Sequence, residues 1–399
     1  MEIIERNNYL NKLLALKDKQ IIKIVTGIRR CGKSTLLEMY QHRLLLNGVE
    51  SNQIIAVNFE SFDFLELRDP KKLYEYINSR ISVTKMNYIF LDEIQHVYKF
   101  PDVVNSLFIK KNVDLYITGS NAYMLSSEIA TLISGRYVEI PMLPLSFKEY
   151  VQSTGDMRDL SLKYANYTRY GGFPYSLELR DQPQELNDYL RGIYSTIVLK
   201  DVVDRKKVSD VMMLENVMRF AFDNIGNILS TKRIADTMTS NGHKIDVKTV
   251  EKYLSALIES FVLYQVKRYN IKGKQYLKTL EKYYVVDMGL RSMLLGSASF
   301  DVGHILENVV YLELLRRGRQ MYVGKVDELE VDFVATDADS LCYYQVAATV
   351  REPSTLLREL APLQNINDNN PKYLLSLDDE SNISHNGIMQ INVLEWLLQ

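Results

Sequence analysis

The chain has 399 residues, a net charge of −2 and 46% hydrophobic residues, which is ordinary for roughly two to four globular domains. This balance gives no overall signal for binding to nucleic acid or to a membrane, and two cysteines are too few for a disulfide framework. No apolar run reaches roughly 18 residues and residues 1–6 are not a signal peptide, so we expect a cytoplasmic protein without a membrane partner.

The first elements of the chain predict an α/β unit. Residues 1–20 carry apolar side chains at helical spacing, and the β-branched run at 21–26 is typical of a buried parallel strand. Residues 27–35, Gly-Ile-Arg-Arg-Cys-Gly-Lys-Ser-Thr, then fit the phosphate-binding pattern in which a glycine and Gly-Lys-Ser flank four residues. An ordinary strand–turn–helix is the alternative interpretation.

The chemistry expected of this loop follows from its residue types. Gly27 and Gly32 allow the backbone to fold closely around a polyphosphate with its N–H groups pointing inward. Lys33 would contact the β- and γ-phosphates, and the hydroxyl of Ser34 would ligate Mg²⁺. The helix that starts near Lys33 would add the positive end of its dipole.

A second motif follows in residues 87–95, after another buried strand predicted at residues 53–59. The apolar strand ends in Asp92 and Glu93, which is what an ATPase needs opposite its phosphate loop. Asp92 would hold Mg²⁺ through water, and Glu93 would orient and deprotonate the attacking water. A strand merely capped by two acids is the alternative.

Two further strands carry candidate site residues. Residues 113–121 predict a strand with a polar carboxyl end, where ligands bind in open α/β sheets. Ser120 or Asn121 would therefore sense the γ-phosphate, or would cap a helix. Arg136 precedes a short strand and would stabilise phosphate charge in cis or in trans, or would form a surface salt bridge.

Five stretches together resemble the prokaryotic AAA+/STAND-like P-loop ATPases. They are residues 27–35, 91–95 (Leu-Asp-Glu-Ile-Gln), 118–121 (Thr-Gly-Ser-Asn), 134–136 (Ser-Gly-Arg) and 144–150 (Pro-Leu-Ser-Phe-Lys-Glu-Tyr). The resemblance implies an α/β core at residues 1–140 with a five-stranded parallel sheet of order 5-1-4-3-2, and a helical lid at 141–204.

The same resemblance implies that the whole loop binds ATP, including Cys31 and Thr35. The paired Arg29 and Arg30 would add positive charge near the phosphates, with Arg30 assisting Lys33. Alternatively, the two arginines would pair with acids outside the site.

The middle of the chain is locally basic. Residues 205–284 hold 15 Lys or Arg against 8 Asp or Glu. The pattern of helices followed by a basic hairpin around residues 272–274 predicts a winged helix-turn-helix domain at 205–286. We expect residues 230–284 to contact duplex DNA, with a protein-interaction or packing module as the alternative.

The last part, residues 287–399, resembles the restriction-endonuclease-like fold in its α-β-β-β-α-β order. Glu307 and Asp332 match the acids of the helix and the second strand. Gln345 and Ala347 stand where an acid and a lysine belong, which weakens a hard-cation site and removes a charge for the scissile phosphate. We therefore expect an inactive nuclease domain.

These features together predict an ATP-binding protein with slow Mg²⁺-dependent hydrolysis that acts as a switch, associated with DNA and forming an ATP-dependent homo-oligomer. One alternative is a scaffold for DNA or protein that nucleotide only orders. A second alternative is an ATP-regulated nuclease.

Overall fold

The computed structural model describes residues 4–120, 135–197, 202–203, 207–208, 210–277, 280–296, 301–338 and 340–399. The chain divides into two compact units, Met1–Pro144 with Glu259–Phe261, and Leu145–Ile258 with Val262–Gln399. Asn121 lies outside the described residues. Among the helices that are described, none has the length and apolar character that crossing a membrane requires.

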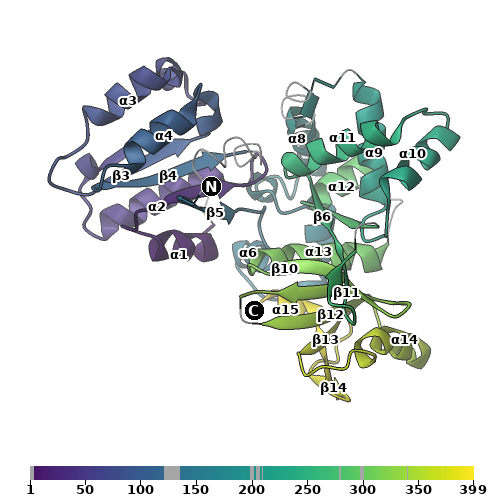
Figure 1. Ribbon diagram of the computed structural model, residues 1–399. Coiled ribbons are helices and arrows are strands. Elements are labelled where there is room, and N and C mark those ends of the chain that lie inside the picture. The colour runs from purple at the N-terminus through teal and green to yellow at the C-terminus, as the bar shows by residue number, and fades with distance from the viewer. Residues whose placement is uncertain are drawn as a thin grey trace. The chain divides into compact units, whose positions relative to one another are not determined.

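A five-stranded parallel sheet forms the centre of the first unit (Figure 1). Its strands are β1 (Ile22–Thr26), β2 (Ile54–Asn58), β3 (Asn87–Asp92), β4 (Val113–Gly119) and β5 (Tyr137–Pro141). They lie in the order β2-β3-β4-β1-β5, so the predicted order 5-1-4-3-2 is confirmed. Strands β1, β3 and β4 are buried along their whole length, which is why they are continuous apolar runs in the sequence.

Helices cover both faces of this sheet. They are α1 (Asn7–Ala15), α2 (Lys33–Leu46), α3 (Pro70–Asn78) and α4 (Phe100–Phe108), with short 3₁₀ helices at Ser51–Gln53, Phe62–Arg68 and Ile94–His96. Figure 1 shows α3 and α4 on one face and α1 and α2 on the other. Residues on α3, α4 and the strands share one apolar core. Because all the strands are parallel, their carboxyl ends lie at one edge of the sheet.

The second unit begins with helices. They are α6 (Phe147–Ser153), α7 (Leu160–Tyr170), α8 (Pro183–Thr196), α9 (Val211–Asp223), α10 (Thr231–Ser240), α11 (Val247–Glu259) and α12 (Met288–Leu295), with a 3₁₀ helix at Pro174–Leu177. The turn predicted at 170–174 lies against α12 so closely that a Cβ on Gly171 would be 2.3 Å from Oδ1 of Asp287. Asp287 caps α12 and also accepts a hydrogen bond from the Gly172 N–H at 2.6 Å.

The predicted basic hairpin is more complex than one wing. Strands β6 (Leu263–Val266) and β9 (Lys282–Val285) pair antiparallel, and β7 (Arg268–Asn270) pairs with β8 (Gln275–Tyr276) between them. Strand β7 also pairs in parallel with β10 of the C-terminal sheet. A hairpin is thus present around residues 272–274 as expected, but it is not separate, because β7 also continues the C-terminal sheet.

That larger sheet has eight strands in the order β14-β15-β13-β12-β11-β10-β7-β8. The remaining elements are α13 (Val302–Arg316), β10 (Gln320–Val326), β11 (Leu329–Thr336), β12 (Leu341–Ala347), α14 (Pro353–Gln364), β13 (Lys372–Ser376), β14 (Ile383–His385), β15 (Ile388–Asn392) and α15 (Val393–Leu397). The expected order α-β-β-β-α-β is present as α13-β10-β11-β12-α14-β13, and β14, β15 and α15 follow it. The sheet is mixed, with parallel and antiparallel pairs.

Candidate nucleotide site

The loop between β1 and α2 requires glycine at its first position. Gly27 has φ +147°, and a Cβ there would lie 2.1 Å from the carbonyl oxygen of Met142. Gly32, with φ +101°, precedes α2 and carries no side chain that could cap the helix. The N–H groups of the first turn of α2 are therefore available to an anion rather than occupied by a capping side chain.

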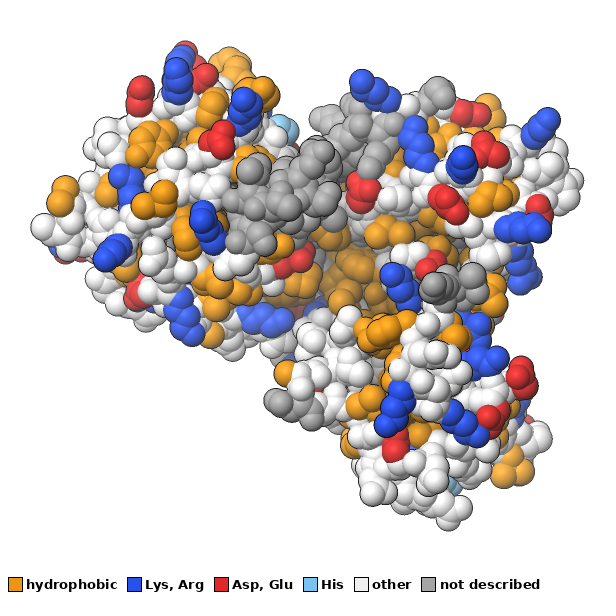
Figure 2. All heavy atoms as spheres, in the orientation of Figure 1, with side chains coloured by type: hydrophobic (Ala, Val, Ile, Leu, Met, Phe, Trp, Pro, Cys, Tyr) orange, Lys and Arg blue, Asp and Glu red, His pale blue; other side chains and the backbone are white. Residues whose placement is uncertain are grey.

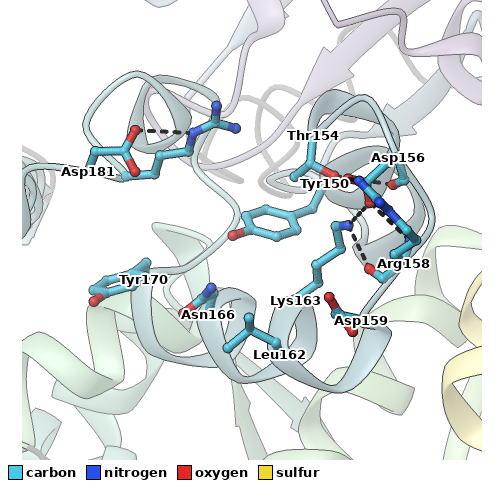
Figure 3. Close-up of a pocket in the computed structure, with 11 residues that line it drawn as sticks. Tyr150, Thr154, Asp156, Arg158, Asp159, Leu162, Lys163, Asn166, Tyr170 and Asp181 are labelled. Atoms are coloured by element: carbon cyan, nitrogen blue, oxygen red, sulfur yellow. Dashed lines mark hydrogen bonds and ion pairs between the residues drawn. The ribbon is translucent and has the colours of Figure 1, made fainter.

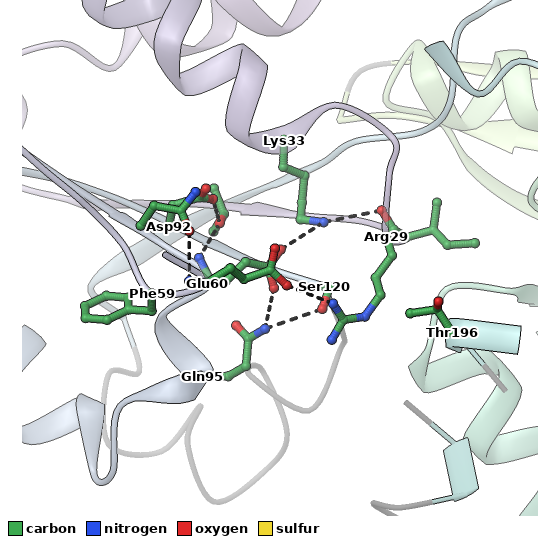
Figure 4. A network of polar contacts seen from close by, with 12 residues as sticks. Arg29, Lys33, Phe59, Glu60, Asp92, Gln95, Ser120 and Thr196 are labelled. Atoms are coloured by element: carbon green, nitrogen blue, oxygen red, sulfur yellow. Dashed lines mark hydrogen bonds and ion pairs between the residues drawn. The ribbon is translucent and has the colours of Figure 1, made fainter. Parts of the chain in front are cut away.

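Lys33 lies at the centre of the site. Its side chain is 4% exposed, and Nζ donates hydrogen bonds to the carbonyl oxygens of Gly27 at 3.1 Å and Ile28 at 3.3 Å (Figure 4). Nζ also lies 3.4 Å from Oε1 of Glu93. The loop backbone thus bends around the ammonium group, which faces the carboxylate predicted to be the base.

Asp92 at the end of β3 is joined to the loop through hydroxyl groups. Thr118 Oγ1 and Ser34 both donate hydrogen bonds to its carboxylate. Burial raises the pKa of Asp92, while the two hydroxyl groups act in the opposite direction. The two residues predicted to hold Mg²⁺, Ser34 and Asp92, are thus in direct contact.

Glu93 has a left-handed backbone, with φ +55°. Its N–H donates to Thr118 Oγ1 at 2.8 Å, and its carboxylate accepts a hydrogen bond from Nε2 of Gln95. Burial alone raises the pKa of Glu93, but Lys33, Gln95 and Arg29 together hold it below the usual value. The carboxylate is therefore ionised at neutral pH, as a general base must be.

The paired arginines diverge. Arg29 forms a 3.1 Å ion pair with Glu60, at the end of β2, as the alternative interpretation expects. It still contributes to the field at Glu93. Arg30 is exposed, with φ +64°, and Thr35 is exposed one turn into α2. Cys31 is buried, and its backbone carbonyl accepts a hydrogen bond from Arg6 at 3.2 Å.

The other predicted residues differ in their placement. Ser120 is fully buried and its Oγ lies 3.4 Å from Nε2 of Gln95, so it belongs to the network in Figure 4. Arg136 is exposed and donates to Asn105 at 3.0 Å. It precedes β5 at the amino edge of the sheet, where its carbonyl pairs with Ile22 at the start of β1. The phosphate loop lies at the opposite, carboxyl edge.

The comparisons with known proteins agree with this geometry. Residues 19–151 match a family described as an AAA domain, and residues 161–301 match a domain of unknown function, DUF8612. An uncharacterized protein of Haemophilus influenzae is 40% identical over 100% of this chain and 99% of its own length. The chain belongs to the family of this protein. Its first unit has the α/β P-loop ATPase fold.

Two further matches concern the family and the fold of this chain. An uncharacterized protein of Methanocaldococcus jannaschii is 30% identical to this AAA-domain protein, over 84% of this chain and 76% of the relative. A solved Walker-type ATPase of Pyrococcus abyssi covers 73% of this chain and 96% of its own, with 14% identity and a TM-score of 0.50. At that identity the likeness is one of fold.

The residues at the site fit Mg²⁺ together with a nucleotide. The hydroxyl of Ser34 and the carboxylate of Asp92 are the hard oxygen donors that Mg²⁺ prefers, and they already lie within hydrogen-bonding distance. The bound ion would neutralise charge on the phosphates. Lys33 supplies a second positive charge from the protein itself.

Two residues that serve this site were not singled out from the sequence. Thr118 bridges Asp92 and Glu93, and Gln95 holds Glu93. The sequence indicates these two residues only weakly. Thr118 is a polar residue within a strand of mostly apolar residues, and Gln95 follows Glu93 by two positions.

The C-terminal acids form a separate buried cluster. Lys282 of β9 places Nζ 2.8 Å from Oε1 of Glu307, 2.7 Å from Oε1 of Glu330 and 3.5 Å from Oδ1 of Asp332. Gln345 accepts from the N–H of Asp332 at 3.4 Å. A lysine from outside the expected motif thus neutralises these carboxylates. Within the described ranges, no three Asp, Glu, His or Cys side chains are grouped to hold a metal ion.

A polar cavity of about 470 Å³ lies beside α6 and α7 (Figure 3). Its charged lining residues pair with one another, since Lys163 contacts Asp156 and Arg180 lies 3.7 Å from Asp181. The tyrosines at positions 150 and 170 also line it. Because its charges are already compensated within the wall, the cavity does not define a particular ligand.

Proposed function

We propose that this protein binds ATP with Mg²⁺ and hydrolyses it slowly, using nucleotide state as a switch. The observation that carries the proposal is the meeting of Lys33, Asp92 and Glu93 at the carboxyl edge of one parallel sheet. In α/β sheets of this kind the ligand binds at that edge. The ionised carboxylate of Glu93 and the ammonium of Lys33 are the base and the phosphate ligand that such a reaction needs.

The proposed chemistry assigns one task to each group. The oxygen of a water molecule bonds to the γ-phosphorus while the bond to the bridging oxygen breaks, and ADP leaves with that electron pair. Glu93 takes the proton of the water, and Lys33 stabilises the charge on the phosphoryl oxygens. Slow turnover is expected because Glu93 is already paired with Lys33, and this ion pair must open before the carboxylate can act on the water.

Phosphate release and nucleotide affinity test this assignment. Lys33→Ala should abolish binding of a fluorescent ATP analogue, because it removes the central cation of the loop. Glu93→Gln should retain binding and lose turnover. Lys71→Ala, on the exposed first turn of α3, is the matched control and should behave as wild type. Equal rates of phosphate release in wild type and Glu93→Gln would remove Glu93 from its role.

A second proposed function is contact with duplex DNA through α10 and α11. In α11, Val250, Leu254 and Leu257 are buried while Lys248 and Lys252 are exposed, which leaves a basic outer face. Lys232, Arg233 and Lys244 are exposed nearby, and Figure 2 shows Lys and Arg side chains over α9–α11, interspersed with acids. The hairpin contributes less, because Lys272 is paired with Asp327.

Binding of duplex DNA across a salt series tests this surface. Each lost phosphate contact lowers the slope of log affinity against log salt by about 1. The double variant Lys248→Ala/Lys252→Ala should therefore lose about 2 from that slope. Lys71→Ala/Lys72→Ala on α3 is the control. Binding that is absent, or independent of salt, would leave the protein-interaction alternative.

Arg136 retains a proposed role only between copies of the chain. Its place at the amino edge of the sheet makes action in trans, within an ATP-dependent homo-oligomer, the form that we propose. Measuring the mass of the protein in solution with and without ATP tests whether such an oligomer forms.

The nucleotide-ordered scaffold is the outcome in which wild-type protein binds ATP without turnover. The regulated nuclease alternative gains no support, because Lys282 already occupies the carboxylates.

A further inference from the structure

Gln95 is held in the site by contacts that fix which way its amide points. Nε2 donates to Oε2 of Glu93 and lies 3.4 Å from Oγ of Ser120 (Figure 4). A carboxylate only accepts hydrogen bonds, so the amide nitrogen, and not the oxygen, must face Glu93. The orientation of the amide is therefore determined by its partner.

The other atom of the same amide is buried, and the part of the chain that the structure describes offers it no partner. Among the described residues, none donates a hydrogen bond to Oε1 of Gln95. Leaving a buried acceptor unpaired is unfavourable, so such an atom is suited to accept from a water molecule. Because Oε1 and Nε2 share one carbon atom, a water bound to Oε1 lies beside the carboxylate that Nε2 holds.

Glu93 is thus held from two sides. Lys33 of α2 lies 3.4 Å from Oε1, and Gln95 donates to Oε2. The hydroxyl of Ser120 also hydrogen-bonds this carboxylate, and Arg29 and Asp92 are further charged groups near it. Lys33 and Gln95 contact different oxygens, so the loss of Gln95 removes the amide donor to Oε2 while the contact with Lys33 remains.

We propose that Gln95 is a positioning residue that orients the carboxylate of Glu93 toward the attacking water. This proposal rests on the proposed ATP hydrolysis and names a residue that controls it. It gives a reason for a buried amide to be held beside the acids. Ser120 contacts the same amide and also hydrogen-bonds the carboxylate of Glu93, which gives that predicted residue a role beside the base.

Two variants separate the donor from the acceptor. Gln95→Met removes both while keeping the length of the side chain, and Gln95→Glu keeps an acceptor but removes the donor. Both should lower kcat about 10- to 100-fold, a range typical of supporting partners. The dissociation constant for a fluorescent ATP analogue should stay within about twofold of wild type, because the Lys33 contacts remain.

The comparison of kcat with nucleotide affinity supplies a readout that a purely structural role would not give. Loss of Gln95 should lower kcat while the affinity for the ATP analogue is kept, because Gln95 contacts the carboxylate of Glu93 rather than the phosphate loop. Gln53→Ala is the matched control, because its Nε2 donates to a carbonyl at the amino edge of the sheet, that of Met86, at 2.7 Å. This control should leave both kcat and the dissociation constant for the ATP analogue unchanged.

The outcomes distinguish this proposal from the proposed function. If wild type and Glu93→Gln both fail to release phosphate, ATP hydrolysis itself is wrong. If wild type is active, Glu93→Gln is inactive and Gln95→Met keeps the wild-type rate, Gln95 has no positioning role. A Gln95→Glu variant with wild-type kcat overturns the assigned donor, and equal losses of affinity and kcat would indicate a purely structural residue.

Discussion

The hydroxyl of Thr118 donates to the carboxylate of Asp92 and accepts the backbone N–H of Glu93 at 2.8 Å. One side chain on β4 therefore fixes both acids at the end of β3. Glu93 has a left-handed backbone. The contact helps to hold that conformation, because the backbone N–H of Glu93 donates to Thr118 Oγ1. The positions of metal ligand and base depend on a residue from the neighbouring strand.

Thr118→Val should weaken the response to Mg²⁺. Valine has the same shape but leaves the N–H of Glu93 unpaired and removes a donor from Asp92. Supporting partners of this kind typically change metal affinity 10- to 100-fold, so we expect the Mg²⁺ concentration for half-maximal phosphate release to rise by about that factor. Thr118→Ser keeps the hydroxyl and is the control. An unchanged midpoint in Thr118→Val would show that Asp92 is positioned without it.

Gly27→Ala should abolish nucleotide binding. A Cβ at this position would lie 2.1 Å from the carbonyl oxygen of Met142, and φ is +147°, so the loop or the segment at 142 must move. Gly48→Ala is the control, because φ is +85° there and nothing lies within 4 Å of the added Cβ. That change should cost only about 1 kcal/mol and should leave affinity for the ATP analogue unchanged. Equal effects of the two changes would contradict the steric argument.

Lys282→Met should strongly destabilise the second unit. Removing the ammonium leaves Glu307 and Asp332 buried without their cation, and breaking such a pair costs about 3–5 kcal/mol. The free energy of unfolding in urea measures the loss. Lys272→Met removes an exposed ion pair with Asp327 and should cost no more than about 1 kcal/mol. A loss of similar size in both variants would show that the buried cluster contributes no special stability.

Much of the first unit was predictable because its signals are local. The strand runs at β1, β3 and β4 are buried along their length, and the motif residues follow those strands directly in the sequence. The contacts of Lys33, Asp92 and Glu93 with one another then follow from parallel strand order. The ion pair of Arg29 with Glu60 was one of two interpretations, and nothing in the loop sequence decides between them.

The second unit was less predictable because its key contacts join distant segments. Lys282 is 25 residues from Glu307 and 50 from Asp332, and it lies on a strand that pairs with β6 rather than with the sheet that carries Asp332. Alternating polar and apolar residues indicate a hairpin at β7 and β8. They do not show that β7 continues the C-terminal sheet by pairing with β10.

Asp287 should make stability depend on pH. Burial raises the pKa of this carboxyl to about 6, although the N–H groups of Gly172, Leu290 and Gly289 act in the opposite direction. The unfolded chain has the usual value near 3.9, so the folded state binds the proton more tightly. Its contribution to stability is therefore complete below about pH 4 and is lost as the pH rises through about 6, by about 3 kcal/mol in total.

Comparison with Asp287→Asn isolates this effect, since other titrating groups cancel in the difference. The free energy of unfolding of wild type minus that of the variant should fall by about 3 kcal/mol between pH 4 and pH 7 and be constant above that range.

Asp246→Asn, at the exposed start of α11, is the control. Hydrogen bonds from Thr249 lower the pKa of Asp246, so its contribution is present above about pH 4 and the corresponding difference should be flat from pH 5 to 7. A difference for Asp287→Asn that rises with pH would mean that its backbone hydrogen bonds outweigh burial, and that the carboxylate is ionised where it joins α12 to the turn at 170–174.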